Sequence, residues 1–140
     1  MINSALRLPW VALPLLTLGL GATVAASWFI VGGSAAYRGP LPVVRDLWLP
    51  LYGMQGLLAA GGTFWFARHA APISSFALVA LIVGAWVGEW LVLLLGNTLF
   101  LGDPVLEFAS FYWFVGTGGP VQPAAAALGG LLALRVERPT

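Results

Sequence analysis

Residues Ile73–Leu95 read ISSFALVALIVGAWVGEWLVLLL, and this stretch decides the class of fold. It contains one acid, Glu89, and no basic residue. At 1.5 Å per residue, a helix of this length is about 35 Å long, slightly more than the roughly 30 Å hydrocarbon core of a bilayer. So long an apolar run predicts a transmembrane helix.

The composition of the whole chain also favours a membrane environment. The 140 residues are 60% hydrophobic and only 8% charged, whereas a soluble domain is about a quarter charged. A globular domain of this size buries only about two-thirds of the surface that it exposes when unfolded, and the rest would be largely apolar here. We therefore expect the lipid bilayer to surround the chain.

Several functional classes are excluded by residue counts. The net charge of +1 provides no basic footprint for nucleic acid. There is no cysteine and only one histidine, His69, so the chain lacks thiolate ligands and a two-histidine site. We predict no metal and no cofactor, and no catalytic residue can be assigned.

Three more apolar runs predict further helices. With the first stretch, the predicted spans are about 10–31, 49–66, 73–95 and 118–136, which makes an all-α polytopic bundle in a single domain. The first is expected to be retained rather than cleaved, because it is longer than the core of a signal peptide. Residues 34–50 are expected to form a loop, and Gly96 and Asn97 are expected to end the third span.

The fourth segment is predicted to be broken or kinked. Asp103 and Pro104 are a good helix start, but a helix from there to Val136 would be about 50 Å long, too long for a simple span. Residues 116–120 read GTGGP and would interrupt it. Two alternatives remain: an interfacial helix over about 104–115 before the fourth span, or one tilted and kinked helix.

Arginine positions predict the orientation. Lys and Arg accumulate on the cytoplasmic side of membrane proteins. With four spans, one side holds both termini and four arginines, Arg7, Arg68, Arg135 and Arg138. The other side holds Arg38 and Arg45, offset by three acids, Asp46, Asp103 and Glu107. The prediction is a multi-pass protein of the cell (inner) membrane with both termini in the cytoplasm.

Glu89 is the residue that most suggests chemistry. A carboxylate within a span costs roughly 2–4 kcal/mol unless it is paired or hydrated, so we expect it to face the bundle interior. If the second and third spans are antiparallel neighbours, Gln55 lies at a similar depth, and Arg45 at the outer end is a possible ion-pair partner. Trp86 and Trp90 are four residues apart on the same helix face and would line a site for a cation.

The predicted ligand-binding residues are therefore Glu89, Gln55, Trp86, Trp90 and Arg45. Each also has a purely structural interpretation. Glu89 and Gln55 would then be hydrogen-bonded between helices, with Gln122 as a further partner, and the tryptophans would pack in the bundle or against lipid. The residues alone do not choose between the two interpretations.

Every predicted span has a face of small residues at a spacing of four. Such faces allow helices to approach closely, either within one chain or between copies and partner subunits. The pairs are Gly21 and Ala25, Gly56 and Ala60, Gly84 and Gly88, and Ala126 and Gly130.

The four-span layout with an acid late in the third span is loosely similar to that of the sterol-isomerase-like EXPERA proteins. The first two spans here carry no acid, so no catalytic residue is transferred from that family. Small multidrug transporters are also four-span proteins, but they carry an acid in their first span, which this chain lacks.

The leading hypothesis is a small membrane protein with a polar intramembrane pocket around Glu89 that binds or transports a small lipophilic or cationic compound. The first alternative is an accessory or anchor subunit of a larger membrane complex. The second is a membrane enzyme acting on a lipid-like substrate.

Overall fold

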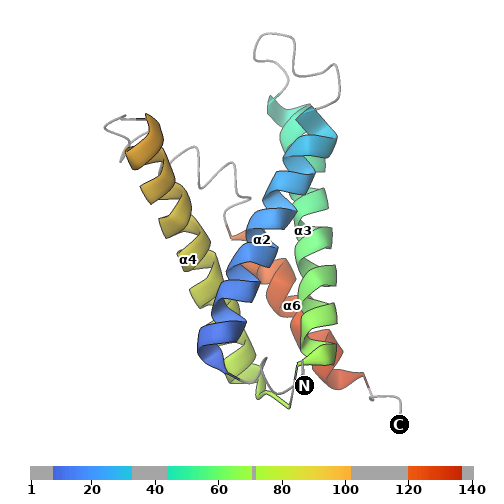
Figure 1. Cartoon of the computed structure of the whole chain (residues 1–140). Coiled ribbons are helices and arrows are strands. Elements are labelled where there is room, and N and C mark those ends of the chain that lie inside the picture. The colour runs from blue at the N-terminus through green and yellow to red at the C-terminus, as the bar shows by residue number, and fades with distance from the viewer. Residues whose placement is uncertain (1–7, 33–43, 71, 102–119, 137–140) are drawn as a thin grey trace.

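The computed structural model describes residues 8–32, 44–70, 72–101 and 120–136. These residues form four α-helices and no strand, which confirms the all-α class (Figure 1). Helices α2 and α4 are long and apolar enough to cross a membrane, by length and composition. The four helices are α2 (Pro9–Gly32), α3 (Val44–His69), α4 (Ser75–Leu101) and α6 (Val121–Arg135).

Two helices extend beyond the predicted spans. Helix α3 begins at Val44, so the expectation of a loop up to residue 50 is wrong for residues 44–50. Helix α4 continues to Leu101, so the predicted end at Gly96 and Asn97 is also wrong. Hydropathy indicates which part of a helix suits an apolar environment, but backbone hydrogen bonding continues past it, and an interior glycine or asparagine opposes this by only about 1 kcal/mol.

Local signals explain how the last two helices begin. The Ser74 hydroxyl oxygen accepts a hydrogen bond from the Ala77 N–H at 3.2 Å, which caps the start of α4. Helix α6 begins at Val121, after Pro120, and Pro123 lies in its first turn, where a missing N–H loses no intrahelical bond. The predicted interfacial helix, and all of the predicted break except Pro120, lie outside the described residues.

The helices run alternately up and down, so α2 is parallel to α4 and α3 is parallel to α6 (Figure 1). Helices α2 and α6 each pack against both α3 and α4. Helices α3 and α4 therefore occupy opposite corners of the bundle, and their extensive contacts are not with each other. The similar depth of Gln55 and Glu89 was expected on the condition that these two helices are antiparallel neighbours; they are antiparallel, but they are not neighbours (Figure 1).

Small residues bring α3 and α6 together most closely. A Cβ atom at Gly56 would lie 3.6 Å from the Ala125 side chain, and a Cβ at Gly129 would overlap the backbone carbonyl of Ala60. The small-residue face predicted on residues 56 and 60 thus packs within the chain, against a matching face on α6. Because the backbones touch here, no larger side chain fits between the two helices.

The GxxxG pair of α4 packs on α2. A Cβ at Gly84 would lie 3.1 Å from Leu13 Cδ1, and a Cβ at Gly88 would lie 3.2 Å from Thr17 Oγ1. The Thr17 hydroxyl also lies 3.4 Å from the carbonyl oxygen of Ala85. In contrast, a Cβ at Gly21 would meet nothing within 4 Å, so the face predicted on α2 is not packed against the described residues.

Each helix buries one narrow stripe and exposes the rest. On α4 the stripe is formed by residues three or four apart, and Glu89 is the last of them among the side chains that the structure describes. The opposite faces expose large apolar side chains, including Phe76 at 85% and Leu99 at 78%. The bundle therefore has an apolar exterior as well as an apolar core.

Candidate functional site

A group of polar side chains is buried within the bundle. Each belongs to the inward stripe of its own helix, and all are at most 3% exposed. We refer to them together as the buried polar residues: Ser27, Gln55, Thr63, Glu89 and Gln122.

Gln122 holds the start of α6 against α2. Its side-chain Nε2 donates a hydrogen bond of 3.0 Å to the Leu20 carbonyl oxygen and another of 3.0 Å to Thr23 Oγ1. The Thr23 hydroxyl in turn donates to the Leu20 carbonyl at 2.7 Å. Both N–H groups of the Gln122 amide are thereby used, and Gln122 acts as a structural link between two helices.

Thr63 makes a similar link between α3 and α6. Its hydroxyl lies 2.6 Å from the Ala126 carbonyl oxygen on α6 and 2.7 Å from the Ala59 carbonyl oxygen on its own helix. A hydroxyl carries a single hydrogen, so it donates to one of these acceptors at a time. The contact is possible because Ala126 and its neighbours are small enough to bring the α6 backbone close to α3.

Glu89 differs from these two residues. Its side chain is only 3% exposed, yet neither carboxyl oxygen has a hydrogen-bond partner among the described residues. Buried polar groups in native proteins are nearly always hydrogen-bonded, and an unsatisfied one opposes folding. A buried carboxyl group without a protein partner is therefore a candidate ligand-binding group.

Helix contacts place Glu89 near the level of Gln122. The adjacent Gly88 packs on Thr17 of α2. Leu20, whose carbonyl binds Gln122, follows Thr17 by three residues, which is about 4.5 Å along a helix axis. Glu89 and Gln122 are therefore separated in depth by about one helical turn.

Gln55 lies at this level too. The next residue, Gly56, faces the Val121 and Ala125 side chains, which flank Gln122 on α6. Three buried polar side chains from three helices thus converge within about one turn of the same depth. The similar depth of Gln55 and Glu89 follows from their common neighbours α2 and α6 rather than from direct packing of α3 on α4.

The other predicted site residues have different surroundings. Trp86 is half-buried and packs against the hydrophobic core, and Trp90 is half-buried on the same helix. Arg45 belongs to the first turn of α3, but its side chain lies outside the described part of the chain. The structure thus brings Glu89 and Gln55 to one level and sets the two tryptophans beside Glu89 along α4.

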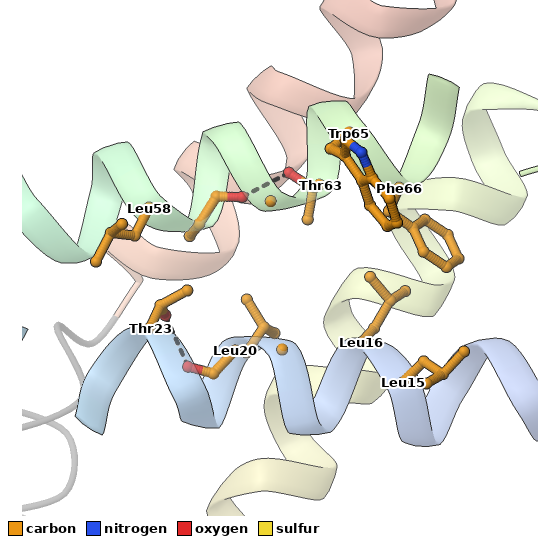
Figure 2. A pocket seen from close by; sticks show the side chains of 11 residues that line it. Leu15, Leu16, Leu20, Thr23, Leu58, Thr63, Trp65 and Phe66 are labelled. Atoms are coloured by element: carbon orange, nitrogen blue, oxygen red, sulfur yellow. Dashed lines mark hydrogen bonds between the residues drawn. The ribbon is translucent and has the colours of Figure 1, made fainter. Parts of the chain in front are cut away.

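A separate cavity lies between α2 and α3 (Figure 2). Its volume is about 370 Å³, and its walls are the Leu15–Thr23 face of α2 and the Leu58–Phe66 face of α3. None of the five predicted site residues lines it. This cavity is not visible in the sequence, because its walls are leucines, glycines and aromatics of the kind found throughout the chain.

The threonines that form hydrogen bonds between helices were not predicted from the sequence either. Thr23 and Thr63 lie in apolar runs, where a threonine usually bonds to its own helix. A signal was present: Thr63 is four residues from the buried Ala59 and eight from Gln55, so the three share one helix face.

No protein-family model, no curated protein and no solved structure matches this chain. Its class is therefore defined by the structure itself. The described residues form an all-helical bundle with an apolar exterior and several buried polar residues, among which the carboxyl group of Glu89 has no described partner.

Proposed function

We propose that this chain is a multi-pass membrane protein that binds a small lipophilic cation at Glu89. The observation that carries the proposal is the carboxyl group of Glu89, which is 3% exposed and has no hydrogen-bond partner among the described residues. A cation within the bundle would provide the missing partner. The half-buried faces of Trp86 and Trp90 beside it suit an aromatic or alkyl body and a cationic centre.

The membrane location is supported by the exterior of the bundle. Only 28% of the apolar window in α2 and 22% of that in α4 is buried within the chain, whereas the core helix of a soluble protein is mostly buried. If the protein were soluble, the remaining leucines, valines and phenylalanines of both helices would be exposed to water. Lipid accommodates such a surface without penalty.

The orientation follows from the basic residues at one end of the bundle. The start of α2 and the ends of α3 and α6 lie at this end (Figure 1). Arg68 and His69 are in the last turn of α3, and Arg135 is in the last turn of α6. By the distribution of arginines, this end is proposed to face the cytoplasm of a cell (inner) membrane.

Single cysteines provide a test of this orientation, because the chain has none of its own. Ser75 and Thr98 lie near opposite ends of α4. In intact cells, an impermeant thiol reagent should label Thr98→Cys and leave Ser75→Cys unlabelled until the membrane is permeabilised. The reverse pattern would invert the topology, and labelling of both without permeabilisation would rule out a transmembrane α4.

Ligand binding is tested with tetraphenylphosphonium, a lipophilic cation, added to the purified protein in detergent. Glu89→Gln keeps the size of the side chain and removes the anionic form. Since a hydrogen bond or ion pair to a charged group contributes about 1.5–3 kcal/mol, binding measured by calorimetry should weaken by about 10- to 100-fold.

The matched control is Glu137→Gln, which removes an acid that follows α6 in the sequence. It should bind the cation like the parent protein. Equal affinity of the parent protein and Glu89→Gln would contradict the proposal, and so would failure of the parent protein to bind the cation at all.

A further inference from the structure

The cavity between α2 and α3 is an apolar groove, and it extends along one half of the bundle. Figure 2 shows Leu16 and Leu20 of α2 facing Leu58 and Phe66 of α3 across it. The part of α3 that lines the groove, from Leu58 to Phe66, is about 12 Å long. This length is close to half of the roughly 30 Å thickness of the hydrocarbon core. The groove thus matches the depth of a single leaflet.

The shape of the groove decides what fits in it. Two glycines, Gly19 and Gly62, line it, and a Cβ at either would meet nothing within 4 Å. The cavity has a volume of about 370 Å³. A single hydrocarbon chain is narrow enough to enter, and the apolar walls suit it.

One arginine lies at the same end of the bundle as the Phe66 end of the groove. Arg68, which is positively charged, and His69 follow in the last turn of α3. The His69 ring stacks on Trp65, a groove residue, with ring centroids 4.5 Å apart. Arg68 donates a hydrogen bond of 3.0 Å to the Val136 carbonyl oxygen, which holds the guanidinium at this end of the bundle. Basic side chains at a membrane surface attract anionic lipid headgroups.

We propose that the groove between α2 and α3 binds one acyl chain of an anionic phospholipid, with the phosphate of the headgroup at Arg68. The occupant belongs to the leaflet on the Arg68 side, which the orientation given above makes the cytoplasmic one. The site depends on the proposed membrane location, but it is separate from Glu89 and does not require a ligand there.

The test uses delipidated, purified protein in detergent and native mass spectrometry. Phosphatidylglycerol and phosphatidylcholine with identical acyl chains are titrated separately. One phosphatidylglycerol per chain should bind about 10-fold more tightly than phosphatidylcholine, because the positive charge of Arg68 attracts the anionic headgroup and contributes about 1 kcal/mol. Arg68→Gln should remove most of this preference, and Arg68→Lys should retain it because the positive charge remains.

Neighbouring glycines provide the matched control for the groove itself. Gly62→Leu fills the groove and should weaken binding of both lipids by at least about 10-fold. Gly61→Leu makes the same change one residue away, at a position that does not line the groove and has equally open surroundings. It should bind both lipids like the parent protein.

Three results would overturn the proposal. Equal affinities for the two lipids would show that the headgroup does not contact the protein. Equal binding by Gly62→Leu and Gly61→Leu would show that the lipid does not occupy the groove. If the protein formed a dimer that lipid did not displace, and if Gly62→Leu abolished this dimer, the groove would be an interface with a second copy of the chain. Glu89→Gln should leave lipid binding intact, so loss of cation binding and loss of lipid binding are separate outcomes. Failure of the membrane location itself would be seen in the cysteine labelling.

Discussion

Replacing Gly129 with alanine should destabilise the bundle by at least about 3 kcal/mol, at the upper end of the usual effect of overpacking a core. The added Cβ would overlap the backbone carbonyl of Ala60. A flexible side chain can rotate away from an extra methyl group, but a helix backbone cannot. Helices α3 and α6 would have to separate, and that movement would strain the bond between Thr63 and the Ala126 carbonyl. Thermal unfolding of the purified protein in detergent measures the loss.

Gly61→Ala is the matched control, because its Cβ would meet nothing within 4 Å. Alanine favours a helix over glycine by about 1 kcal/mol, so this variant should be as stable as the parent protein or slightly more stable. Gly130→Ala should lie between the two, since its Cβ would meet the flexible end of the Leu78 side chain, at 2.7 Å from Cδ2. Equal stability of the Gly129 and Gly61 variants would show that α3 and α6 are not in backbone contact.

Replacing Glu89 with leucine should stabilise the protein by about 2 kcal/mol while abolishing cation binding. The carboxyl group is buried without a hydrogen bond to the described residues, so its removal relieves a desolvation penalty. Leucine has a similar volume and suits the apolar stripe of α4. A gain in stability together with a loss of binding is the pattern expected of a residue retained for function.

Gln122→Leu is the corresponding control. It makes the same kind of replacement, but Gln122 donates hydrogen bonds to Leu20 and Thr23. Loss of these bonds should destabilise the protein by about 1–2 kcal/mol. If Glu89→Leu also destabilised the protein by this amount, Glu89 would be a structural hydrogen-bonding residue like Gln122.

Much of the candidate site was visible in the sequence. A polar residue in an otherwise apolar run has a strong reason to face inward, and Glu89, Gln55 and Gln122 are all buried. Their hydrogen-bonding status was not visible, because it depends on which atoms of other helices reach them. The amide N–H groups of Gln122 are bonded by α2, a helix about a hundred residues earlier in the chain, while its Oε1 has no partner among the described residues. Glu89 meets no such acceptor or donor among the described residues.

The order of helices around the bundle was not visible either. From the sequence, α3 and α4 were considered as neighbours only as a condition for Gln55 and Glu89 to lie at a similar depth. The structure instead separates them, because α6 fits against α3 through the contact of Gly129 with Ala60. A match between two small-residue faces is a property of a pair of helices, and neither sequence segment specifies its partner alone.

The sequence by itself therefore determined the helical class, the apolar exterior and the identity of the residues that must be buried. These follow from local quantities: the length of an apolar run and the free energy of placing a polar group in an apolar environment. The tertiary structure alone decided which helices pair, which polar groups are satisfied, and where a groove remains. Apart from a few polar residues such as Glu89 and Ser27, α2 and α4 are apolar on all sides, so hydrophobicity alone hardly distinguishes their inner faces from their outer ones. Close packing and hydrogen bonds between helices make that choice.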